Sequence, residues 1–381
     1  MANTITNVLP RLLAQGLRAL RELAIMPRVV NRSYDALAQQ QGDVINIPIP
    51  SAVTATAVTP SITPASNQDI NPTTVAVTLD FWREATFQMS DQDLKEVMMG
   101  TIPMQASEAI KALANAIDDY ILGKHVGIFS FSGTEGTTPF STAITVAGSA
   151  RTLLNKQLAG QNDRRAVLDP DAEGNFLVLG NILQTDQRGD QGGIINGTIG
   201  RKLGIEWFMD QNITTFTPGT GWASGNIAST LSGAVGETTL NIINATASGQ
   251  IKVGDLFSVV GSVDGSQYVV TVTTTLSATV AGIITFTPAL VSAVDTGTTL
   301  AVVSIVYVAN LMFHRDAFAW ASRPLLDIQG LGNPMTAVTD PISGISLRLE
   351  VSRQYKQTTF SYDVLGGAAL IRAELATKIL G

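Results

Sequence analysis

The segment Ile102–Leu122, IPMQASEAIKALANAIDDYIL, has the clearest helical period in the sequence. Its large apolar residues recur at steps of three and four, as one face of a helix requires: Ile110, Leu113, Ile117 and Ile121. Pro103 is acceptable in a first turn, because its missing N–H would have no helical partner there. Glu108, Lys111 and Asp118 mark the other face. The segment therefore predicts a long helix with one buried face.

The residues that precede this helix have the period of strands. Apolar residues alternate with polar residues or proline in two runs, residues 45–50 and 75–82. This pattern predicts two strands of a long hairpin. Pro48 and Pro50 cannot donate ladder hydrogen bonds, so the first strand is expected at an edge. The intervening Ser51–Thr74 is rich in Thr, Pro, Ser and Ala, and we expect an extended loop that orders against a neighbour.

The N-terminal residues predict a basic amphipathic helix that ends at Pro27. Apolar residues recur there at helical steps: Leu9, Leu12, Leu13, Leu17, Leu20, Leu23 and Ala24. Five arginines stand against Glu22 and Asp35, a net charge of +3. Two interpretations are equally supported, a solvated helix and an arm that docks on a partner or an acidic polymer. The spacing of the arginines does not fit a signal peptide.

Shorter elements are expected on both sides of the long helix. Helices are predicted by capping residues and apolar spacing at Ser90–Met99, Ser149–Ala159 and Asn181–Gln187. Strand-like runs occur at Arg165–Leu168, Phe176–Leu179 and Gly204–Met209. This order of helices and strands predicts a region of mixed α/β structure.

The composition changes abruptly between Phe216 and Ser304. This stretch holds five charged residues in 89 and sixteen threonines, with no helical period. Alternating runs between turn residues predict strands at Asp255–Val260, Tyr268–Thr274 and Ile283–Phe286. A small antiparallel sandwich or barrel, inserted into a host domain, accounts for the pattern.

After residue 304 the sequence again has the mixture of helical and strand periods that precedes residue 216. Phe313–Ala321 is predicted to be helical. Ile345–Ser352 and Thr359–Leu365 alternate as strands, and they would pair across a polar turn at Tyr355–Gln357. The ending Gly366–Gly381 is apolar and nearly uncharged, so we expect it to be packed.

The composition restricts the class of protein. The 381 residues hold 24 basic and 31 acidic side chains, a net charge of −7, and charged residues make up only 14%. A soluble domain ordinarily carries about 25%, so much of the surface is expected to be buried against another molecule. The hydrophobic content argues against disorder, and no apolar run is long enough for a membrane span. The absence of cysteine excludes disulfides, thiolate catalysis and cysteine-ligated metal.

Motifs that would carry catalysis are absent from the sequence. The step Gly123–Lys124 is followed by His125 and lacks the preceding glycine of a phosphate-binding loop. No Gly-x-Ser-x-Gly or His-Glu-x-x-His occurs. We interpret the two histidines, His125 and His314, as structural residues. The sequence predicts no enzyme, no catalytic residues and no cofactor-binding residues.

Two groups of acidic residues are candidate functional sites. Asp169, Asp171, Glu173 and Gly174 imitate the opening of a calcium loop, but Gly180 occupies the twelfth position, where a bidentate carboxylate is needed. A turn between two strands explains the same residues, and no metal site is predicted. The pair Asp118 and Asp119 is expected to face solvent, because adjacent helix positions do not face each other.

Three stretches are similar to the major capsid (coat) proteins of tailed bacteriophages, whose fold is the HK-ninety-seven fold. They are GTIGRKLGIEWFMDQNI (Gly197–Ile213), LMFHRDAFAWASRPL (Leu311–Leu325) and SYDVLGGAALIRAELATKILG (Ser361–Gly381). The order of the predicted elements resembles that family over nearly the whole chain. The branch that it most resembles is the coat protein of short-tailed phages, which carries an inserted β-domain.

The resemblance implies an α+β fold with the parts of a capsid subunit. Residues 1–42 would form the N-terminal helical arm and residues 43–88 the extended hairpin loop. The capsid core, with its long spine helix and its peripheral and axial domains, would comprise residues 89–215 and 305–381. Residues 216–304 would form the inserted all-β domain.

The resemblance also implies a structural function, self-assembly into the icosahedral shell that encloses phage double-stranded DNA. The partners would be further copies of the chain, in hexamers and pentamers, with a scaffolding protein, a portal and a decoration protein. Packaged DNA would be contacted weakly, since the chain is acidic, and no membrane is involved. The location would be the virion, after assembly in the cytoplasm of the bacterial host. The resemblance does not imply cross-linking or autoproteolysis for this chain, because no reactive Lys–Asn pair or protease is identified in the sequence.

Two alternatives remain open at the level of the sequence. An encapsulin-like compartment would use the same fold, although the large insertion argues against it. A surface adhesin or glycan-binding protein is suggested only by the threonine-rich residues 216–304.

Overall fold

The computed structural model describes residues 24–34, 44–51, 53–55, 57, 60, 69–91, 104–180, 197, 199–222, 227–244, 248–261, 265–325, 333–340 and 343–381. The chain forms two compact units, which are considered one at a time. Unit 1 comprises residues 1–19, 32–113 and 319–371, and unit 2 comprises residues 20–31, 114–318 and 372–381.

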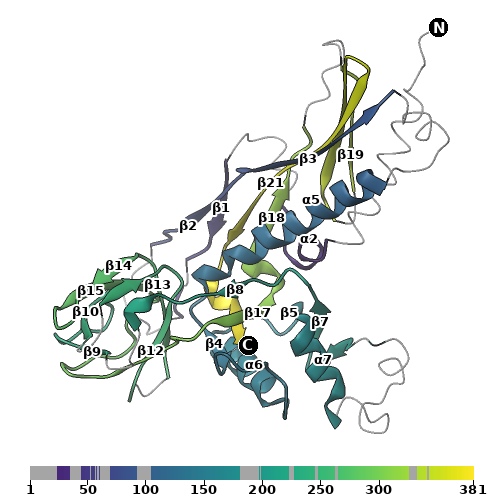
Figure 1. Cartoon of the computed structure of the whole chain (residues 1–381). Helices are drawn as coiled ribbons and strands as arrows, with labels where there is room; N and C mark the ends of the chain where they lie inside the picture. The colour runs from purple at the N-terminus through teal and green to yellow at the C-terminus, as the bar shows by residue number, and fades with distance from the viewer. Residues whose placement is uncertain are drawn as a thin grey trace. The chain divides into compact units, whose positions relative to one another are not determined.

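Unit 1 contains the predicted hairpin strands. β1 (Val44–Ile49) pairs antiparallel with β2 (Thr73–Thr78), with Val44 opposite Thr78 (Figure 1). The alternation buries Ile45, Ile47 and Val77, which pack with Leu79 and with residues from the C-terminal part of the unit. The hairpin pairing is therefore confirmed. The second predicted strand differs, because it stops at Thr78 and the chain enters a new strand at Phe81.

A five-stranded sheet is the larger of the two sheets described in unit 1. Its order is β18 (Phe318–Ser322), β21 (Gln357–Leu370), β20 (Ser346–Gln354) and β19 (Met335–Thr339), and β3 (Phe81–Ser90) pairs with β21. The predicted C-terminal strand pair is β20 and β21, which meet antiparallel and are confirmed. Ser90 ends β3, where it pairs with Gln357. The helix predicted to begin at Ser90 lies outside the described residues beyond Asp91.

The long helix is confirmed as α5 (Met104–Leu122), drawn as one unbroken helix in Figure 1. The apolar positions that predicted it are each at most 2% exposed: Ile110, Leu113, Ile117 and Ile121. Pro103, expected in its first turn, lies outside the described residues.

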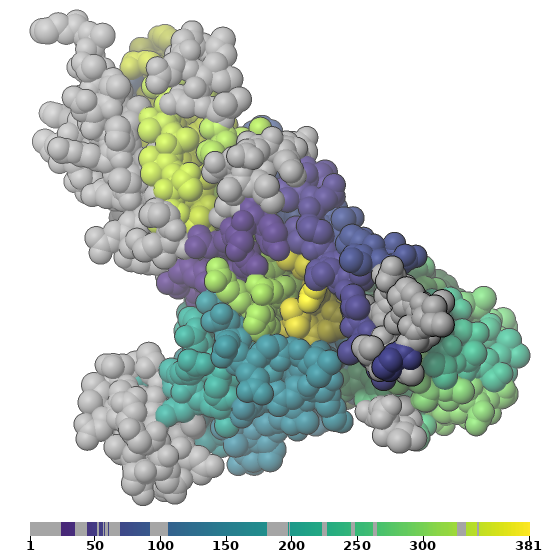
Figure 2. All heavy atoms as spheres, turned by 180° about the vertical axis from the view of Figure 1, so that it is seen from behind, coloured from purple at the N-terminus to yellow at the C-terminus, as the bar shows by residue number. Residues whose placement is uncertain are grey.

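Unit 2 is built around a second sheet. Its order is β4 (Phe131–Gly133), β22 (Ala376–Leu380), β17 (Tyr307–His314), β5 (Arg164–Leu168), β7 (Ile205–Met209) and β6 (Arg201–Lys202), and β8 (Thr215–Phe216) also pairs with β17. The predicted strands at 165–168 and 204–209 are confirmed as β5 and β7. β22 is buried throughout, so the C-terminal residues are packed as predicted; Figure 2 shows them in yellow beside blue-green residues of this unit.

Three helices of unit 2 have bounds that differ from the sequence predictions. α6 (Thr145–Lys156) begins four residues earlier and ends three residues earlier than expected. α7 (Pro170–Val178) replaces the strand predicted at 176–179, which was wrong because Asp169 and Pro170 start a helix there. α2 (Met26–Val29) has Pro27 inside its first turn, so Pro27 does not end a helix. The helix predicted at 181–187 lies outside the described residues, as do residues 1–23.

The helix predicted at Phe313–Ala321 was wrong. These residues end β17, pass through the 3-10 turn η4 (Arg315–Ala317) and enter β18. β18 is buried at every position, so its apolar run has no period of two, and such a run cannot be distinguished from a helix by period alone.

Residues 216–304, called the inserted domain below after the prediction made for them, contain an antiparallel sheet as predicted; the rest of unit 2 is called the host part. Its order is β16 (Leu300–Val302), β12 (Leu256–Val259), β13 (Gln267–Val270), β15 (Gly282–Thr287), β10 (Thr239–Asn244) and β9 (Ile227–Ser229). A bridge between Ala228 and Thr299 joins the two ends of this order, as in a barrel. β11 (Gly249–Ile251) and β14 (Thr274–Leu276) form a separate pair, and η3 (Thr220–Trp222) precedes the sheet. Phe216 itself belongs to β8.

Candidate functional site

The two histidines of the chain make structural contacts. His125, in the 3-10 helix η2 (Gly123–Gly127), is 4% exposed, and its Nδ1 donates to the carbonyl oxygen of Leu122 at 2.9 Å. His314 ends β17, and its Nδ1 accepts the backbone N–H of Asp316 at 3.2 Å. Each ring is therefore held by a local contact, which favours the structural interpretation.

The carboxylates that imitate a calcium loop start a helix. Asp169 is the N-cap of α7, and its Oδ2 accepts the backbone N–H groups of Asp171 and Ala172 at 3.2 and 3.4 Å. Pro170 takes a first-turn position, where its missing N–H costs nothing. The expected turn between two strands is wrong in one respect, since the second element is the helix α7. Helix capping fully accounts for Asp169 and Pro170 at these positions.

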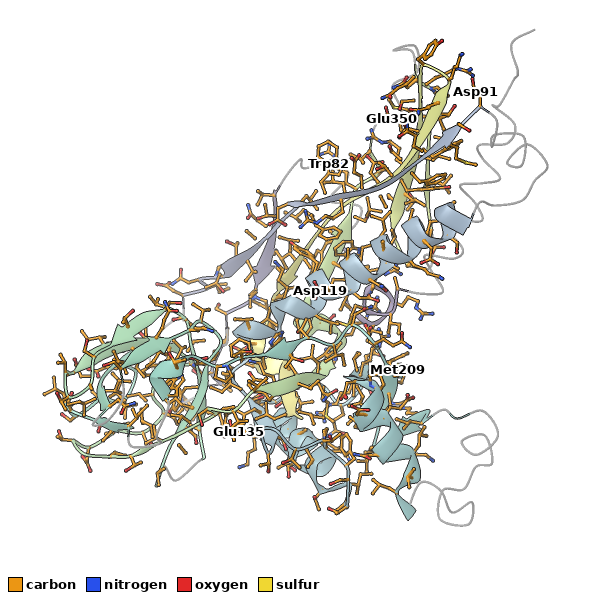
Figure 3. The ribbon with its side chains drawn as sticks, viewed as in Figure 1. Trp82, Asp91, Asp119, Glu135, Met209 and Glu350 are labelled. Atoms are coloured by element: carbon orange, nitrogen blue, oxygen red, sulfur yellow. The ribbon has the colours of Figure 1, made fainter. Side chains whose placement is uncertain are left out.

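The prediction for Asp118 was wrong and that for Asp119 was right. Asp118 is 0% exposed, whereas Asp119, labelled in Figure 3, is exposed. The two side chains do lie on different faces of the helix. Asp118, however, lies four residues after Ala114 and three before Ile121, which are both buried. It therefore belongs to the buried face of α5.

Among the described residues, no three His, Asp or Glu side chains come together in a way that could hold a metal ion. Among the same residues, no helix has both the length and the apolar character needed to cross a membrane.

A set of polar contacts holds the segment Ile25–Asn31, called here the anchor segment, against the rest of unit 2. The Asp118 carboxylate accepts the backbone N–H groups of Ile25 and Met26 at 3.0 and 2.9 Å. The Arg165 guanidinium donates to the carbonyl oxygens of Arg28 and Val29.

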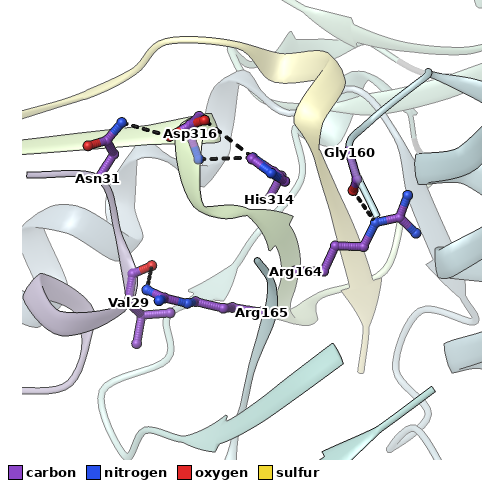
Figure 4. A network of polar contacts seen from close by, with 7 residues as sticks. All are labelled: Val29, Asn31, Gly160, Arg164, Arg165, His314 and Asp316. Carbon is purple, nitrogen blue, oxygen red and sulfur yellow. Dashed lines mark hydrogen bonds and ion pairs between the residues drawn. The ribbon is translucent and has the colours of Figure 1, made fainter. Parts of the chain in front are cut away.

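The other end of the anchor segment is held through Asn31. Its Nδ2 donates to Asp316 Oδ1 at 2.7 Å, and its backbone N–H donates to Phe318 O at 3.1 Å. Figure 4 shows the contact between Asn31 and Asp316 and the contact between Arg165 and Val29. Side chains from three separate elements, α5, β5 and η4, thus hold the anchor segment.

The ionised forms of Asp118 and Asp210 are electrostatically unfavourable. Burial, reinforced by the charge of Asp210, raises the pKa of Asp118 to about 7, and the two backbone N–H groups and Arg28 oppose this. Asp210 is 1% exposed, and burial raises its pKa as well. Burial therefore disfavours ionisation of both carboxylates, of which Asp118 contacts the anchor segment directly.

The inserted domain is joined to the host part of unit 2 by polar and apolar contacts. The Gln267 side-chain amide forms two hydrogen bonds with Phe131, accepting its N–H at 2.8 Å and donating to its carbonyl oxygen at 2.7 Å. Apolar residues from both sides share a cluster: Leu256, Val269, Val303, Tyr307, Ala309 and Leu380. The Ile305 N–H donates to Glu135 at 2.9 Å, and Glu135 is labelled in Figure 3.

Asp255 is the buried charge of the inserted domain. Its carboxylate accepts the Trp222 Nε1–H at 2.6 Å, the Lys252 N–H at 2.7 Å and the Gly219 N–H at 3.1 Å. Burial raises the pKa of Asp255, and these donors oppose the rise. The side chain closes the loop that precedes β12, so its role is structural.

Lys378 is a buried amine within the host sheet. It is 0% exposed, its Nζ has no hydrogen-bond partner among the described residues, and it lies 5.8 Å from the centre of the Phe216 ring. Burial lowers its pKa to about 7. Burial and the nearby Lys378 charge lower the pKa of His125 to about 4. Lys378 was not identified from the sequence, because a single Lys in the run Ala376–Leu380 carries no motif.

Large apolar side chains lie on the surface of the inserted domain. Eight of its Leu, Val and Ile residues are more than 40% exposed: Leu231, Val235, Val253, Val260, Val272, Val280, Ile283 and Val291. In unit 1, Trp82 on β3 is 61% exposed, and its Nε1–H donates to Asp363 at 3.4 Å (Figure 3). Contiguous exposed apolar patches are typical of surfaces that contact other proteins, whereas single exposed side chains are ordinary on a folded protein.

The comparisons with known proteins establish the fold. No protein-family model matches the sequence, and no curated protein matches it. A chain of Mycobacterium phage Che8 matches with a TM-score of 0.50 and 16% identity, over 93% of this chain and 90% of that chain. The structure titled as the asymmetric unit of the bacteriophage PhiM1 mature capsid matches with a TM-score of 0.46 and 10% identity, over 90% of this chain and 83% of that one.

A virus-like particle from Pyrococcus furiosus matches with a TM-score of 0.46 and 7% identity, over 97% of this chain and 98% of that one. The likeness to the Mycobacterium phage Che8 chain covers nearly all of both chains and establishes a shared α+β fold. The predicted fold class is confirmed.

Proposed function

We propose that the protein is the major capsid subunit of a tailed phage, a structural and non-enzymatic protein that assembles into an icosahedral shell around double-stranded DNA. The observation that carries the proposal is the fold shared with the Mycobacterium phage Che8 chain over 93% of this chain. The capsid-like stretches of the sequence support it independently. A shell subunit works through contacts between copies, so it needs no catalytic constellation.

The surface chemistry supports the same proposal. Only 14% of the residues are charged, and large apolar side chains remain exposed on the inserted domain. Subunit interfaces are depleted of charge at their centres. Repeated contacts between identical subunits would bury these groups by symmetry. The partners would therefore be further copies of the chain, arranged as hexamers and pentamers.

Residues 216–304 would be an inserted domain of the kind carried by coat proteins of short-tailed phages. The described strands β9–β16 share an apolar core of their own, which supports this division. Residues 1–42 would be the arm, 43–88 the hairpin loop, and 89–215 with 305–381 the capsid core.

The remaining partners follow from the same proposal. A scaffolding protein, a portal and a decoration protein would contact the shell, which would assemble in the bacterial host cytoplasm and become part of the virion. A net charge of −7 predicts weak, non-specific contact with packaged DNA.

Light scattering coupled to size exclusion tests the proposal. The full chain has a mass of 40.2 kDa, and the proposal predicts particles in the megadalton range, formed alone or when a scaffolding protein is added. A variant that lacks residues 2–23 keeps the anchor segment and should fold as the full chain does, but form aberrant particles or none. A full chain that remains monomeric under every scaffolding and crowding condition, and binds glycans instead, would contradict the proposal.

A further inference from the structure

The strand β19 (Met335–Thr339) is an end strand of the larger sheet of unit 1, and it pairs with β20 on one side. Its residues are half-buried or exposed, so solvent reaches the strand along its length. The sequence of the strand, MTAVT, contains no charged residue and no proline. β19 therefore lies at an accessible and uncharged edge of its sheet.

The backbone groups of β19 are divided between an inner and an outer side. Two hydrogen bonds with the β20 side flank the strand: Pro334 O accepts the Val351 N–H at 3.1 Å, and the Asp340 N–H donates to Ile345 O at 3.0 Å. In an antiparallel ladder every second residue bonds to the neighbouring strand, and the residues between them turn their N–H and C=O groups away. The residues whose backbone groups turn outward are Met335, Ala337 and Thr339.

These outward groups have no partner in the part of the chain that the structure describes. Apart from the ladder with β20, no backbone hydrogen bond of Met335, Ala337 or Thr339 occurs among the described residues. A row of free N–H and C=O groups along an extended strand is a template for pairing with a further strand.

Other sheet edges of the chain are closed against such pairing. Pro48 in β1 has no N–H to donate, and β6 consists of Arg201 and Lys202. At β4 the side chain of Gln267 occupies both the N–H and the C=O of Phe131. Prolines, charged side chains and covering groups are the means by which proteins protect an edge, and β19 has none of them on its own residues.

We propose that β19 is an interface between two copies of this chain, in which the two strands pair antiparallel about a twofold axis at Ala337. The outward groups are arranged symmetrically about Ala337. Ala337 would therefore oppose the partner's Ala337, and Met335 would oppose the partner's Thr339. In this register every free N–H group of one copy meets a free C=O group of the other.

The chemistry of the strand favours a second copy as the partner. A twofold interface places the same residues of both copies together. Like charges that oppose each other across two strands are destabilising, and β19 carries no charge that would be repelled by its own copy. The inference rests on the proposed function, because a shell brings copies together repeatedly, and it names one surface through which they would meet.

A single introduced thiol tests the register. The full chain contains no cysteine, so Ala337→Cys provides the only thiol of the molecule. Opposed residues of a hydrogen-bonded antiparallel pair have Cα atoms about 5.5 Å apart, within the range of about 4.4–6.8 Å that a disulfide spans. Mild oxidation of the full-length variant, both as soluble protein and as particles, should give a covalent dimer on non-reducing gels. The disulfide traps the pair even where the contact is transient.

The matched control for the thiol is Val338→Cys, at the next residue of the same strand. In the proposed register Val338 is displaced by two residues from the partner's Val338, a diagonal separation of about 7–8 Å. This distance is too long for a disulfide. Val338→Cys should therefore give little covalent dimer under the same oxidation.

A second variant tests the hydrogen bonds themselves. Ala337→Pro removes the outward N–H, which does not bond to β20, and proline is tolerated on an edge in this orientation. Loss of this donor from both copies should raise the protein concentration needed for association by about tenfold, measured by light scattering. Ala337→Ser keeps the N–H and should associate as the unmodified chain does.

Three results would overturn the interface. They are the absence of covalent dimer from Ala337→Cys in both soluble protein and particles, equal dimer from Ala337→Cys and Val338→Cys, and equal association of Ala337→Pro and Ala337→Ser. Particles that form without the cross-link would reject the β19 interface and leave the proposed function standing. A cross-linked dimer from a chain that forms no particles would support the interface and reject the shell.

Discussion

The inserted domain and the host part of unit 2 differ in what they bury. The core of the inserted domain consists of apolar and aromatic side chains, and its one buried charge among the described residues, Asp255, has three donors. The host part buries Asp118, Asp210 and Lys378, each with a raised or lowered pKa. Two of these three have an atom without a hydrogen-bond partner among the described residues.

This difference predicts that the stability of the two regions depends on pH to different degrees. Buried groups with perturbed pKa values make stability depend on pH. The inserted domain has one such group among the described residues, Asp255, whose raised pKa is opposed by three donors. The host part has at least three, so its stability should respond more strongly to proton concentration than that of the inserted domain.

The largest expected effect comes from the core of the inserted domain. Phe257 is 0% exposed and its ring lies 5.3 Å from Tyr268 and 5.4 Å from Phe286, centre to centre. Phe257→Ala should lower the free energy of unfolding by about 3–5 kcal/mol, through lost burial and the cavity left behind. Calorimetry of the full chain should show the inserted domain melting first.

The matched control for Phe257 is Val260→Ala, at a residue that is 54% exposed on the same domain. It should change the free energy of unfolding by less than about 0.5 kcal/mol. Equal effects at both positions would mean that the inserted domain has no specific core.

Replacing Lys378 is expected to change the free energy of unfolding by a smaller amount and in the opposite direction. Its pKa falls from the ordinary 10.5 to about 7 in the folded chain, so the folded state binds fewer protons and stability rises with pH between about 7 and 10.5. Lys378→Met should raise the free energy of unfolding at pH 7 by about 1–4 kcal/mol, and the gain should shrink toward pH 10. Denaturant titrations at both pH values measure this.

Lys156→Met is the control for Lys378, because Lys156 is exposed on α6 in the same unit. It should change stability by less than about 0.5 kcal/mol at either pH. A destabilised Lys378→Met variant would show that the amine has a partner that stabilises it, and would weaken the contrast with the inserted domain.

The smallest effect concerns the junction between the two regions. Gln267→Ala removes both hydrogen bonds to Phe131, at about 0.5–1.5 kcal/mol each. The melting transitions of the inserted domain and the host should move apart. Gln250→Ala, exposed on β11, should leave them in place. Transitions that move equally in both variants would show that Gln267 does not couple the regions.

Parts of the fold with one strong period could be predicted from the sequence. α5 has one apolar face, and β20 and β21 alternate on either side of a polar turn. Elements buried on both sides could not be predicted, because β18 has no alternation to reveal it. α7 was missed because Phe176–Leu179 has a strand-like composition, whereas the Asp169 cap determines the local structure.

The candidate site was harder to predict than the fold. Asp118 is next to an exposed acid, and only its helical spacing from Ala114 and Ile121 places it on the buried face. Arg165 comes from β5, and sequence distance gives no sign that it lies near the anchor segment. Tertiary packing creates this site.

Negative-stain electron microscopy of the purified full-length protein, with and without a scaffolding protein, tests the central claim most directly. The account predicts closed shells of uniform size with icosahedral symmetry. Fields that contain only single subunits or irregular aggregates in every condition would contradict the assignment of this chain as a shell subunit.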